Sequence, residues 1–165
     1  MRLIILGAGG YGKTIADIAE QSGRYEAIRM LDDAGKEKCA DYVRYIDENT
    51  EFYPAFGNNE TRLHWLDRLM DEGCSVATLV HPTAYISPKA KLHLGTAVLP
   101  HAVVNTDCEI MPGCIINCGA MIDHGCIIEA GVHICLGAIV KAGNRIPRCM
   151  KIEAEQVVEN RTYPL

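Results

Sequence analysis

The hydrophobic positions in the second half of the chain recur every six residues. An aliphatic residue returns at this interval from Ile86 to Val158 without interruption. The full set is Ile86, Leu92, Val98, Val104, Ile110, Ile116, Ile122, Ile128, Ile134, Val140, Ile146, Ile152 and Val158. An amphipathic helix would instead require apolar residues at intervals of three and four. The pattern therefore excludes a helix over this half of the chain.

Two further positions of each six-residue unit have residue types of their own. Small residues precede the aliphatic ones by two places, at Ala84, Ala90, Thr96, Ala102, Cys108, Cys114, Ala120, Cys126, Val132 and Ala138. Glycines follow many of them by three places, at Gly95, Gly113, Gly119, Gly125, Gly131, Gly137 and Gly143. One large apolar residue, one small residue and one turn glycine per unit predict a hexapeptide parallel β-helix. Each unit supplies a short strand and a tight corner, with the aliphatic and small side chains inside.

The first part of the chain alternates strands and helices. Residues 2–6 form a continuous apolar run, which predicts a strand buried on both faces of a parallel sheet. A glycine-rich turn at residues 7–12 leads into a predicted helix at Lys13–Gln21 and a second strand at Ala27–Leu31. Asp32-Asp33 then follows, about twenty positions after the turn, as in βαβ units that hold nucleotides.

The same alternation continues as far as a proline boundary. Residues 34–50 are polar and predict a loop with one short element. The elements expected next are a strand at Glu51–Phe56, a helix at Glu60–Glu72 with Leu63, Leu66, Leu69 and Met70 on one face, and a strand at Ser75–Val80. His81-Pro82 marks the expected boundary, so we predict domains at residues 1–80 and 81–165. The first is too short for a full dinucleotide fold, which favours a mononucleotide ligand such as a nucleotide-linked sugar.

Composition narrows the class of protein further. The chain has 165 residues, an apolar content of 48% and a net charge of −5, which argues against a nucleic-acid partner. We find no signal peptide and no apolar run long enough for a membrane span, so we expect a cytoplasmic protein. Of the eight cysteines, Cys108, Cys114 and Cys126 fall on the small inward position, where a reduced thiol acts as a small hydrophobe.

Several motifs, taken in order, resemble the sugar acetyltransferases of the sialic-acid and bacillosamine type, within the left-handed β-helix acyltransferases. They are residues 7–12 (GAGGYG), 31–33 (LDD), 57–59 (GNN) with Arg62, 79–84 (LVHPTA), 115–117 (IIN), 122–124 (IDH) and 131–134 (GVHI). The resemblance covers nearly the whole chain. It implies a Rossmann-like domain that binds a nucleotide-linked sugar, and a left-handed β-helix that assembles as a homotrimer. Acetyl-CoA would be the acyl donor, bound between neighbouring β-helices, and no metal is expected.

The resemblance also implies roles for individual residues of the repeat. His124 matches the catalytic base, and a histidine that titrates near neutral pH suits removal of a proton from an attacking amine or hydroxyl. Asp123 would orient the imidazole or balance its charge, with a solvated surface acid as the equal alternative. Asn117, His133 and Gly143 match the acetyl-CoA site. In many relatives an acidic residue follows the histidine, whereas this chain has Gly125.

In the first domain, the resemblance places Gly9, Gly10 and Tyr11 against the sugar or phosphates. Asp32 and Asp33 would accept hydrogen bonds from the base or ribose. Tyr11 stands where some relatives have a histidine, so the sugar contacts would differ.

A second departure is the end of the repeat, which alters the expected donor site. After Gly143 the glycine position is taken by Cys149, Glu155 and Arg161, so the acetyl-CoA groove is expected to be shortened. Two alternatives to the acetyltransferase stay open. One is a metal hydratase of the γ-carbonic anhydrase kind, and the other is a non-catalytic module that binds sugar nucleotides.

Overall fold

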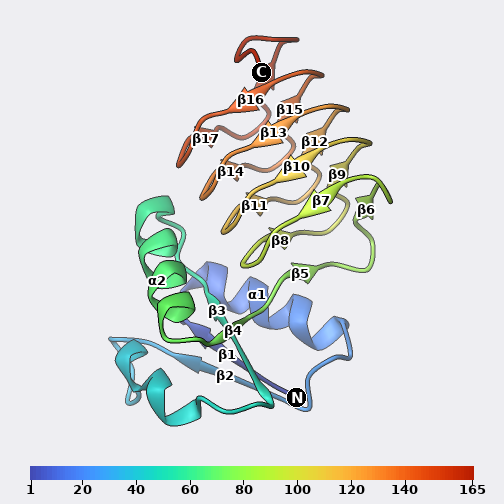
Figure 1. Cartoon of the computed structure of the whole chain (residues 1–165). Coiled ribbons are helices and arrows are strands. Elements are labelled where there is room, and N and C mark those ends of the chain that lie inside the picture. Colours follow the sequence, from blue (N-terminus) through green and yellow to red (C-terminus); the bar gives the residue numbers. More distant parts are fainter. The chain divides into compact units, whose positions relative to one another are not determined.

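The computed structural model describes residues 1–165, which divide into two compact units, Met1–Leu79 and Val80–Leu165. We call them the N-terminal domain and the repeat domain, and Figure 1 shows their elements. None of the helices combines the length and the apolar character that crossing a membrane requires.

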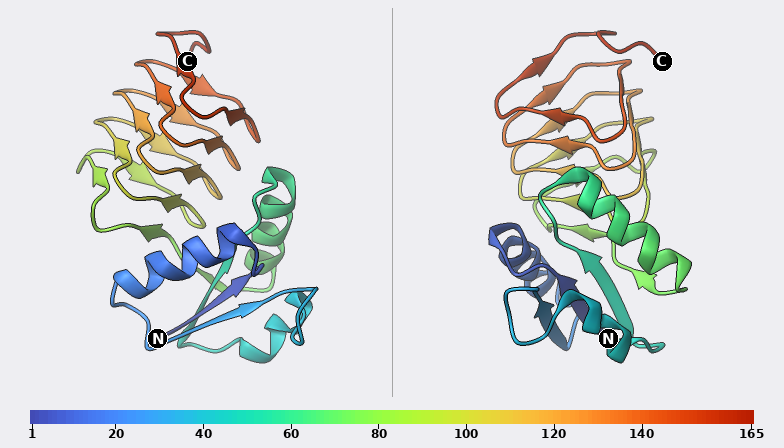
Figure 2. Two further views of the ribbon diagram at one scale, coloured as in Figure 1. Left: turned by 180° about the vertical axis from the view of Figure 1, so that it is seen from behind. Right: turned by 90° about the vertical axis from the view of Figure 1, so that its left-hand side faces the viewer.

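The N-terminal domain is a four-stranded parallel sheet with strand order β2-β1-β3-β4. Its elements are β1 (Arg2–Leu6), α1 (Gly10–Gln21), β2 (Ala27–Leu31), the 3₁₀ helix η1 (Cys39–Tyr45), β3 (Thr50–Pro54), α2 (Asn59–Asp71) and β4 (Ser75–Val76). Helix α1 connects β1 to β2, and α2 connects β3 to β4 in the opposite direction along the sheet, so the helices cover opposite faces (Figure 2). The predicted alternation of strands and helices is confirmed.

Burial in this domain follows from the central position of β1. Ile4 and Leu6 pack with Leu69 of α2 and Tyr42 of η1 in one cluster. Helix α1 buries Ile15, Ile18 and Ala19, which lie on one face of the helix. Because both faces of β1 are covered, its apolar run is continuous rather than alternating.

Three details of the prediction are wrong. Helix α1 begins at Gly10 rather than Lys13, because Gly12 belongs to the helix and lets it approach the turn: a Cβ there would lie 2.1 Å from the carbonyl oxygen of Gly7. Met70 is 44% exposed, one helical step away from the buried Leu69. The strand expected at Ser75–Val80 is two strands, β4 and β5 (Leu79–Val80), which belong to different sheets.

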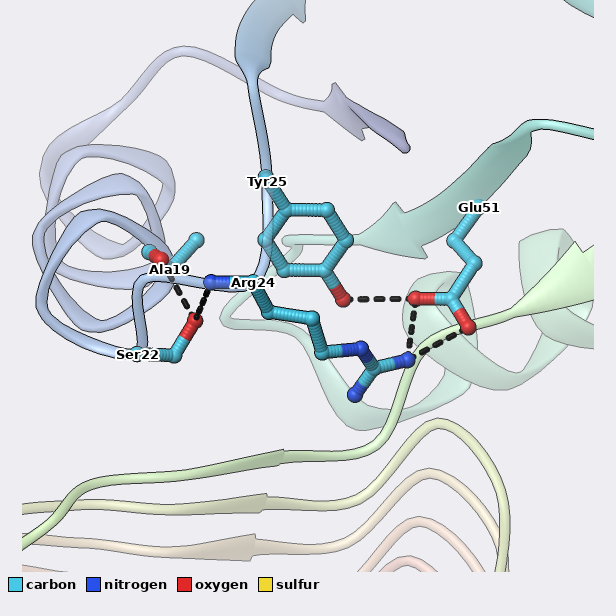
Figure 3. A network of polar contacts seen from close by, with 5 residues as sticks. All are labelled: Ala19, Ser22, Arg24, Tyr25 and Glu51. Carbon is cyan, nitrogen blue, oxygen red and sulfur yellow. Dashed lines mark hydrogen bonds and ion pairs between the residues drawn. The ribbon is translucent and has the colours of Figure 1, made fainter.

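A polar network fixes the loop between α1 and β2 at the amino ends of the strands (Figure 3). The Arg24 guanidinium contacts both carboxylate oxygens of Glu51, and the Tyr25 hydroxyl donates to the same carboxylate at 2.6 Å. Burial and this carboxylate raise the pKa of Tyr25. The network lies at the sheet edge opposite the glycine-rich turn, so we regard it as structural.

The repeat domain consists of two-residue strands that pair in parallel with the strands 18 residues away. Three six-residue units therefore complete one coil, and the strands stack into three parallel sheets. The β12 sheet contains β6 (Tyr85–Ile86), β9 (Val103–Val104), β12 (Met121–Ile122), β15 (Ile139–Val140) and β18 (Val157–Val158). The β13 sheet contains β7 (Lys91–Leu92), β10 (Glu109–Ile110), β13 (Ile127–Ile128) and β16 (Arg145–Ile146). The β14 sheet contains β5, β8 (Ala97–Val98), β11 (Ile115–Ile116), β14 (His133–Ile134) and β17 (Lys151–Ile152).

The interior of the coil holds the two predicted sets of side chains. The aliphatic residues from Val98 to Val158 and the small residues from Ala102 to Ala138 form one buried cluster. All eight cysteines are free, and Cys108, Cys114 and Cys126 are buried, as predicted.

The corner glycines are explained by backbone geometry. The seven predicted glycines have φ between +63° and +71°. Where glycine is replaced, the same left-handed conformation persists in His101, Asp107, Cys149, Glu155 and Arg161, with φ between +56° and +61°. The geometry of the coil therefore requires a left-handed backbone conformation at these corners, and residues other than glycine adopt it with some strain.

Candidate functional site

The glycine-rich turn lies at the carboxyl edge of the N-terminal sheet and is fastened to Asp32. The Asp32 carboxylate accepts hydrogen bonds from the backbone N–H of Ala8 at 2.7 Å and of Ala34 at 2.9 Å. These two bonds lower the pKa of Asp32. The Asp32 carboxylate therefore holds the glycine-rich turn in place through hydrogen bonds within the protein.

The other candidate residues of this edge differ in what they offer. Gly9 and Gly10 are exposed at the start of α1, which has neither a side-chain cap nor an acidic residue in its first turn. Such a helix start is suited to an anion. The Tyr11 hydroxyl pairs with that of Tyr53 at 2.8 Å, and an Asp33 oxygen accepts the backbone N–H of Cys39 at 2.9 Å.

A second turn, between β3 and α2, meets the first. A Cβ on Gly7 would lie 3.0 Å from the carbonyl oxygen of Ala55. Arg62 is fully buried and donates to the Phe56 carbonyl and to the Asn59 side chain, both at 2.8 Å. Sequence reasoning assigned no role to Arg62, although an arginine on the apolar face of a predicted helix was a usable signal.

In the repeat domain, His124 lies in the corner between β12 and β13; Figure 1 labels these two strands. Its backbone N–H donates to Oδ1 of Asp123 at 2.7 Å, and the same oxygen accepts Nδ2 of Asn105 at 3.3 Å. The imidazole is exposed and has no hydrogen-bond partner in the chain. Asp123 thus holds the main chain of His124 and leaves the ring free to accept a proton.

A pocket of about 530 Å³ opens beside this imidazole. Its lining residues are His124, Gly125, Ala142, Gly143, Asn160, Arg161 and Leu165. Because Ala142 and Gly143 have little or no side chain, the coil that follows His124 leaves a notch. The expected site residues His124 and Gly143 therefore share one cavity.

The other two expected donor-site residues lie at a different corner. Asn117 Nδ2 and His133 Nε2 are 3.0 Å apart, and the Asn117 side chain also accepts the backbone N–H of Cys118. Asn117 precedes β12 whereas His124 follows it, so the pair lies at the opposite edge of the β12 sheet. Within one chain, the expected site is divided between these two corners.

Sequence reasoning missed Asn144 and the residues at the far end of the pocket. Asn144 is fully buried on the small inward position, and its Nδ2 donates to the carbonyls of Lys141 and Glu159. Its Oδ1 accepts the backbone N–H of Tyr163, which holds the last residues across the final coil. An asparagine at a position that small residues occupy in the preceding units was the available signal. No group of three or more metal-ligating side chains comes together in the chain.

The fold and the candidate site together define a two-domain protein. One domain has a glycine-rich turn of the kind found in nucleotide-binding βαβ units, and the other has an exposed histidine at a corner of a six-residue repeat. Residues 2–69 match the family described as the PglD N-terminal domain. The acetyltransferase domain of PglB from Neisseria gonorrhoeae, solved with acetyl coenzyme A, is similar with a TM-score of 0.92 and 30% identity over 97% of this chain and 82% of that one. The chain therefore belongs to the sugar acetyltransferase family that includes this PglB domain.

Two further relatives extend the comparison. UDP-N-acetylbacillosamine N-acetyltransferase from Bacillus subtilis is 32% identical over 107 residues, 58% of this chain and 50% of the relative. The match thus spans about half the length of that curated relative. Perosamine N-acetyltransferase from Caulobacter crescentus shares the fold, with a TM-score of 0.63 and 16% identity over 98% of this chain and 91% of that one.

Proposed function

We propose that the protein transfers an acetyl group from acetyl-CoA to the amine of a nucleotide-linked amino sugar. The observation that carries the proposal is the unpartnered imidazole of His124 at the mouth of a pocket, in a chain whose fold is similar to that of an acetyltransferase domain solved with acetyl coenzyme A. An amine acceptor is favoured because the Bacillus subtilis relative is an N-acetyltransferase.

In the proposed mechanism His124 is the general base. The sugar amine attacks the thioester carbonyl carbon, a C–N bond forms, and the imidazole takes the proton that the amine loses. Collapse of the intermediate breaks the C–S bond, and the same proton passes to the leaving thiolate to give free CoA. The role proposed for Asp123 is to hold the backbone of His124 through the 2.7 Å bond.

The donor would lie in the pocket along Ala142 and Gly143, with its thioester at His124. Asn117 and His133 are proposed to contact the donor from the other corner. The acceptor nucleotide would bind the carboxyl edge of the N-terminal sheet, where Gly9, Gly10 and Tyr11 face the phosphates or sugar. Asp32 and Asp33 would contact the base or ribose. Their carboxylates can accept further hydrogen bonds in addition to those from Ala8 and Cys39.

We further propose that the N-terminal domain is a Rossmann-like nucleotide-binding domain and that the repeat domain is a left-handed β-helix that forms a homotrimer. The 18-residue return of the strands supports the β-helix. The outward residues of the β12 sheet support an interface between copies, since all are apolar: Tyr85, Val103, Met121, Ile139 and Val157. Tyr85 is 55% exposed and Met121 42% exposed in the isolated chain. This face lies between the His124 and Asn117 corners, so packing of copies there would bring one corner of each together.

The activity is tested by incubating the protein with acetyl-CoA and a panel of nucleotide-linked amino sugars while following the release of free thiol. We expect release with at least one amino sugar and none with the matching hydroxyl sugar. If no amino sugar accelerates thiol release above the background of acetyl-CoA hydrolysis, the proposed reaction is wrong.

The shared site is tested by complementation. His124→Ala and Asn117→Ala chains are each expected to be weakly active alone. The two variants are then unfolded, mixed in equal amounts and refolded together. Each shared site needs an intact His124 from one copy and an intact Asn117 from its neighbour, and each of these is present with a probability of one half. About one quarter of the sites should therefore be restored. Absence of recovery in mixed trimers, or a monomeric wild-type protein, would remove the interface proposal without touching the reaction.

A further inference from the structure

Arg161 is the least expected residue of the His124 pocket. Its corner position is occupied by glycine in the two preceding coils, at Gly125 and Gly143, and Arg161 adopts φ +56°. A side chain in this region is strained, because its Cβ crowds the backbone. The structure therefore holds a large cation where the coil favours glycine.

The side chain of Arg161 lies along the pocket wall. A Cβ on Gly143 would lie 3.5 Å from Cγ and 3.8 Å from Nε of Arg161, so the arginine crosses directly over that glycine. A Cβ on Gly143 would thus be in ordinary van der Waals contact with Arg161, so glycine is favoured at this position by its φ of +69° rather than by lack of space.

The guanidinium of Arg161 has no partner in the chain. Six other arginines form ion pairs with carboxylates, namely Arg2, Arg24, Arg29, Arg44, Arg68 and Arg145. Arg161 forms no hydrogen bond or ion pair and lines the pocket. A planar guanidinium with all its donors free matches a phosphate.

We propose that Arg161 is the phosphate-binding residue of the His124 pocket. The proposal rests on the proposed acetyl transfer, in which both substrates contain a diphosphate. His124 and Arg161 lie two coils apart, about 10 Å along the coil axis at the usual spacing of paired strands. A donor whose thioester lies at His124 and whose arm follows Ala142 and Gly143 would extend toward this arginine, so the diphosphate of CoA is the favoured source.

The test uses Arg161→Met, with Arg148→Met as the control because Arg148 is an exposed arginine outside the pocket. Calorimetry measures binding of CoA and of pantetheine, which has no phosphate. We expect Arg161→Met to weaken CoA about tenfold to 100-fold and to leave pantetheine unchanged, as loss of a charge-assisted contact predicts. Arg148→Met should leave both unchanged.

Kinetics identify which substrate supplies the phosphate. A KM that rises for acetyl-CoA alone assigns it to the donor, and one that rises for the nucleotide sugar alone assigns it to the acceptor. Equal weakening of CoA and pantetheine, or no weakening of either substrate, overturns the phosphate role. Failure of the wild-type protein to bind CoA at all would instead reject the proposed acetyl transfer.

Arg161→Gly gives an independent readout. Glycine should relieve the strained corner and raise the melting temperature by about 2–4 °C while CoA binding falls. A variant that is less stable, or one that binds CoA as well as the wild type, would show that Arg161 serves packing rather than phosphate binding.

Discussion

The two corners that flank β12 share one backbone design and differ in chemistry. At the first corner, Asn117 accepts the backbone N–H of Cys118 at 2.8 Å, and at the second, Asp123 accepts that of His124 at 2.7 Å. Gly119 and Gly125 then turn the chain with φ of +66° and +65°. The peptide path of the two corners is therefore alike.

The difference between the corners comes from the outward side chains and from the next coil. Asn117 is bonded to His133, whereas the imidazole of His124 is free. In the coil that follows, Leu136 protrudes beside the first corner and is 54% exposed, whereas Ala142 leaves a notch beside the second. The pocket thus forms beside the second corner because the residue at this position is Ala142, whereas the larger Leu136 occupies the equivalent position beside the first corner.

The largest effect is expected from removing His124, the proposed general base at the second corner. His124→Ala should lower kcat by about 10²–10⁴, because general-base catalysis contributes that much. Circular dichroism and the melting temperature should not change, since the imidazole has no partner in the chain. His64→Ala, an exposed histidine of α2, is the control. An unchanged kcat would exclude His124 as the base.

Making the second corner resemble the first should close the pocket. Ala142→Leu introduces the side chain that Leu136 has at the other corner, and we expect CoA to bind about tenfold to 100-fold more weakly, because the notch is filled. Ala130→Leu is the matched control, since Ala130 precedes Gly131 as Ala142 precedes Gly143, at the third corner. Titration calorimetry measures both, and equal effects in the two variants would contradict the assignment of the pocket.

The role of Asp123 can be separated into hydrogen bonding and charge. Asp123→Asn keeps an oxygen that accepts the His124 N–H, as Asn117 does at its own corner, and should retain kcat within about threefold. Asp123→Ala removes the acceptor and should lower kcat about tenfold, the equivalent of one such bond. Steady-state kinetics compare the two. If asparagine is as damaging as alanine, the charge of Asp123 acts on the imidazole directly.

The smallest expected effect tests the shared backbone. Gly119→Ala and Gly125→Ala should each destabilise the protein by about 1–2 kcal/mol, because alanine is strained at positive φ. Nothing lies within 4 Å of the missing Cβ at either position, so contacts should add little. Thermal unfolding measures both losses. Markedly unequal losses would show that the two corners are not equivalent.

The sequence was most informative where the structure is periodic. The aliphatic and small positions of the repeat, its corner glycines and the order of elements from β1 to α2 were all predictable from local patterns. The sequence-based predictions were wrong where the structure of a segment depends on pairing with residues far away along the chain. Ser75–Val80 reads as one apolar strand, yet β4 and β5 pair in different sheets, a choice made by strands far away along the chain. Nothing local distinguishes the two halves of that run.

The candidate site shows the same division. The family resemblance selected His124, Asp123 and Asn117 as candidate residues, and His124 lines a pocket in the structure. Only the three-dimensional structure reveals that Asp32 is bonded to the glycine-rich turn, and that Arg62 is buried beneath the second turn. The bond from Ala8 to Asp32 joins residues 24 positions apart, and the burial of Arg62 depends on the packing around it. Local composition predicts neither feature.

By itself, the sequence determined the period of six and hence the coil, because each unit must bury one aliphatic side chain and turn one corner. The tertiary structure decided which corner residues lie together and which of them line a pocket. Stacking at 18-residue intervals places Ala142, Gly143 and Arg161 above His124 and Gly125, and places His133 against Asn117. The physical reason is that a pocket forms from the side chains of successive coils, whose sizes and charges become neighbours only after the chain has wound.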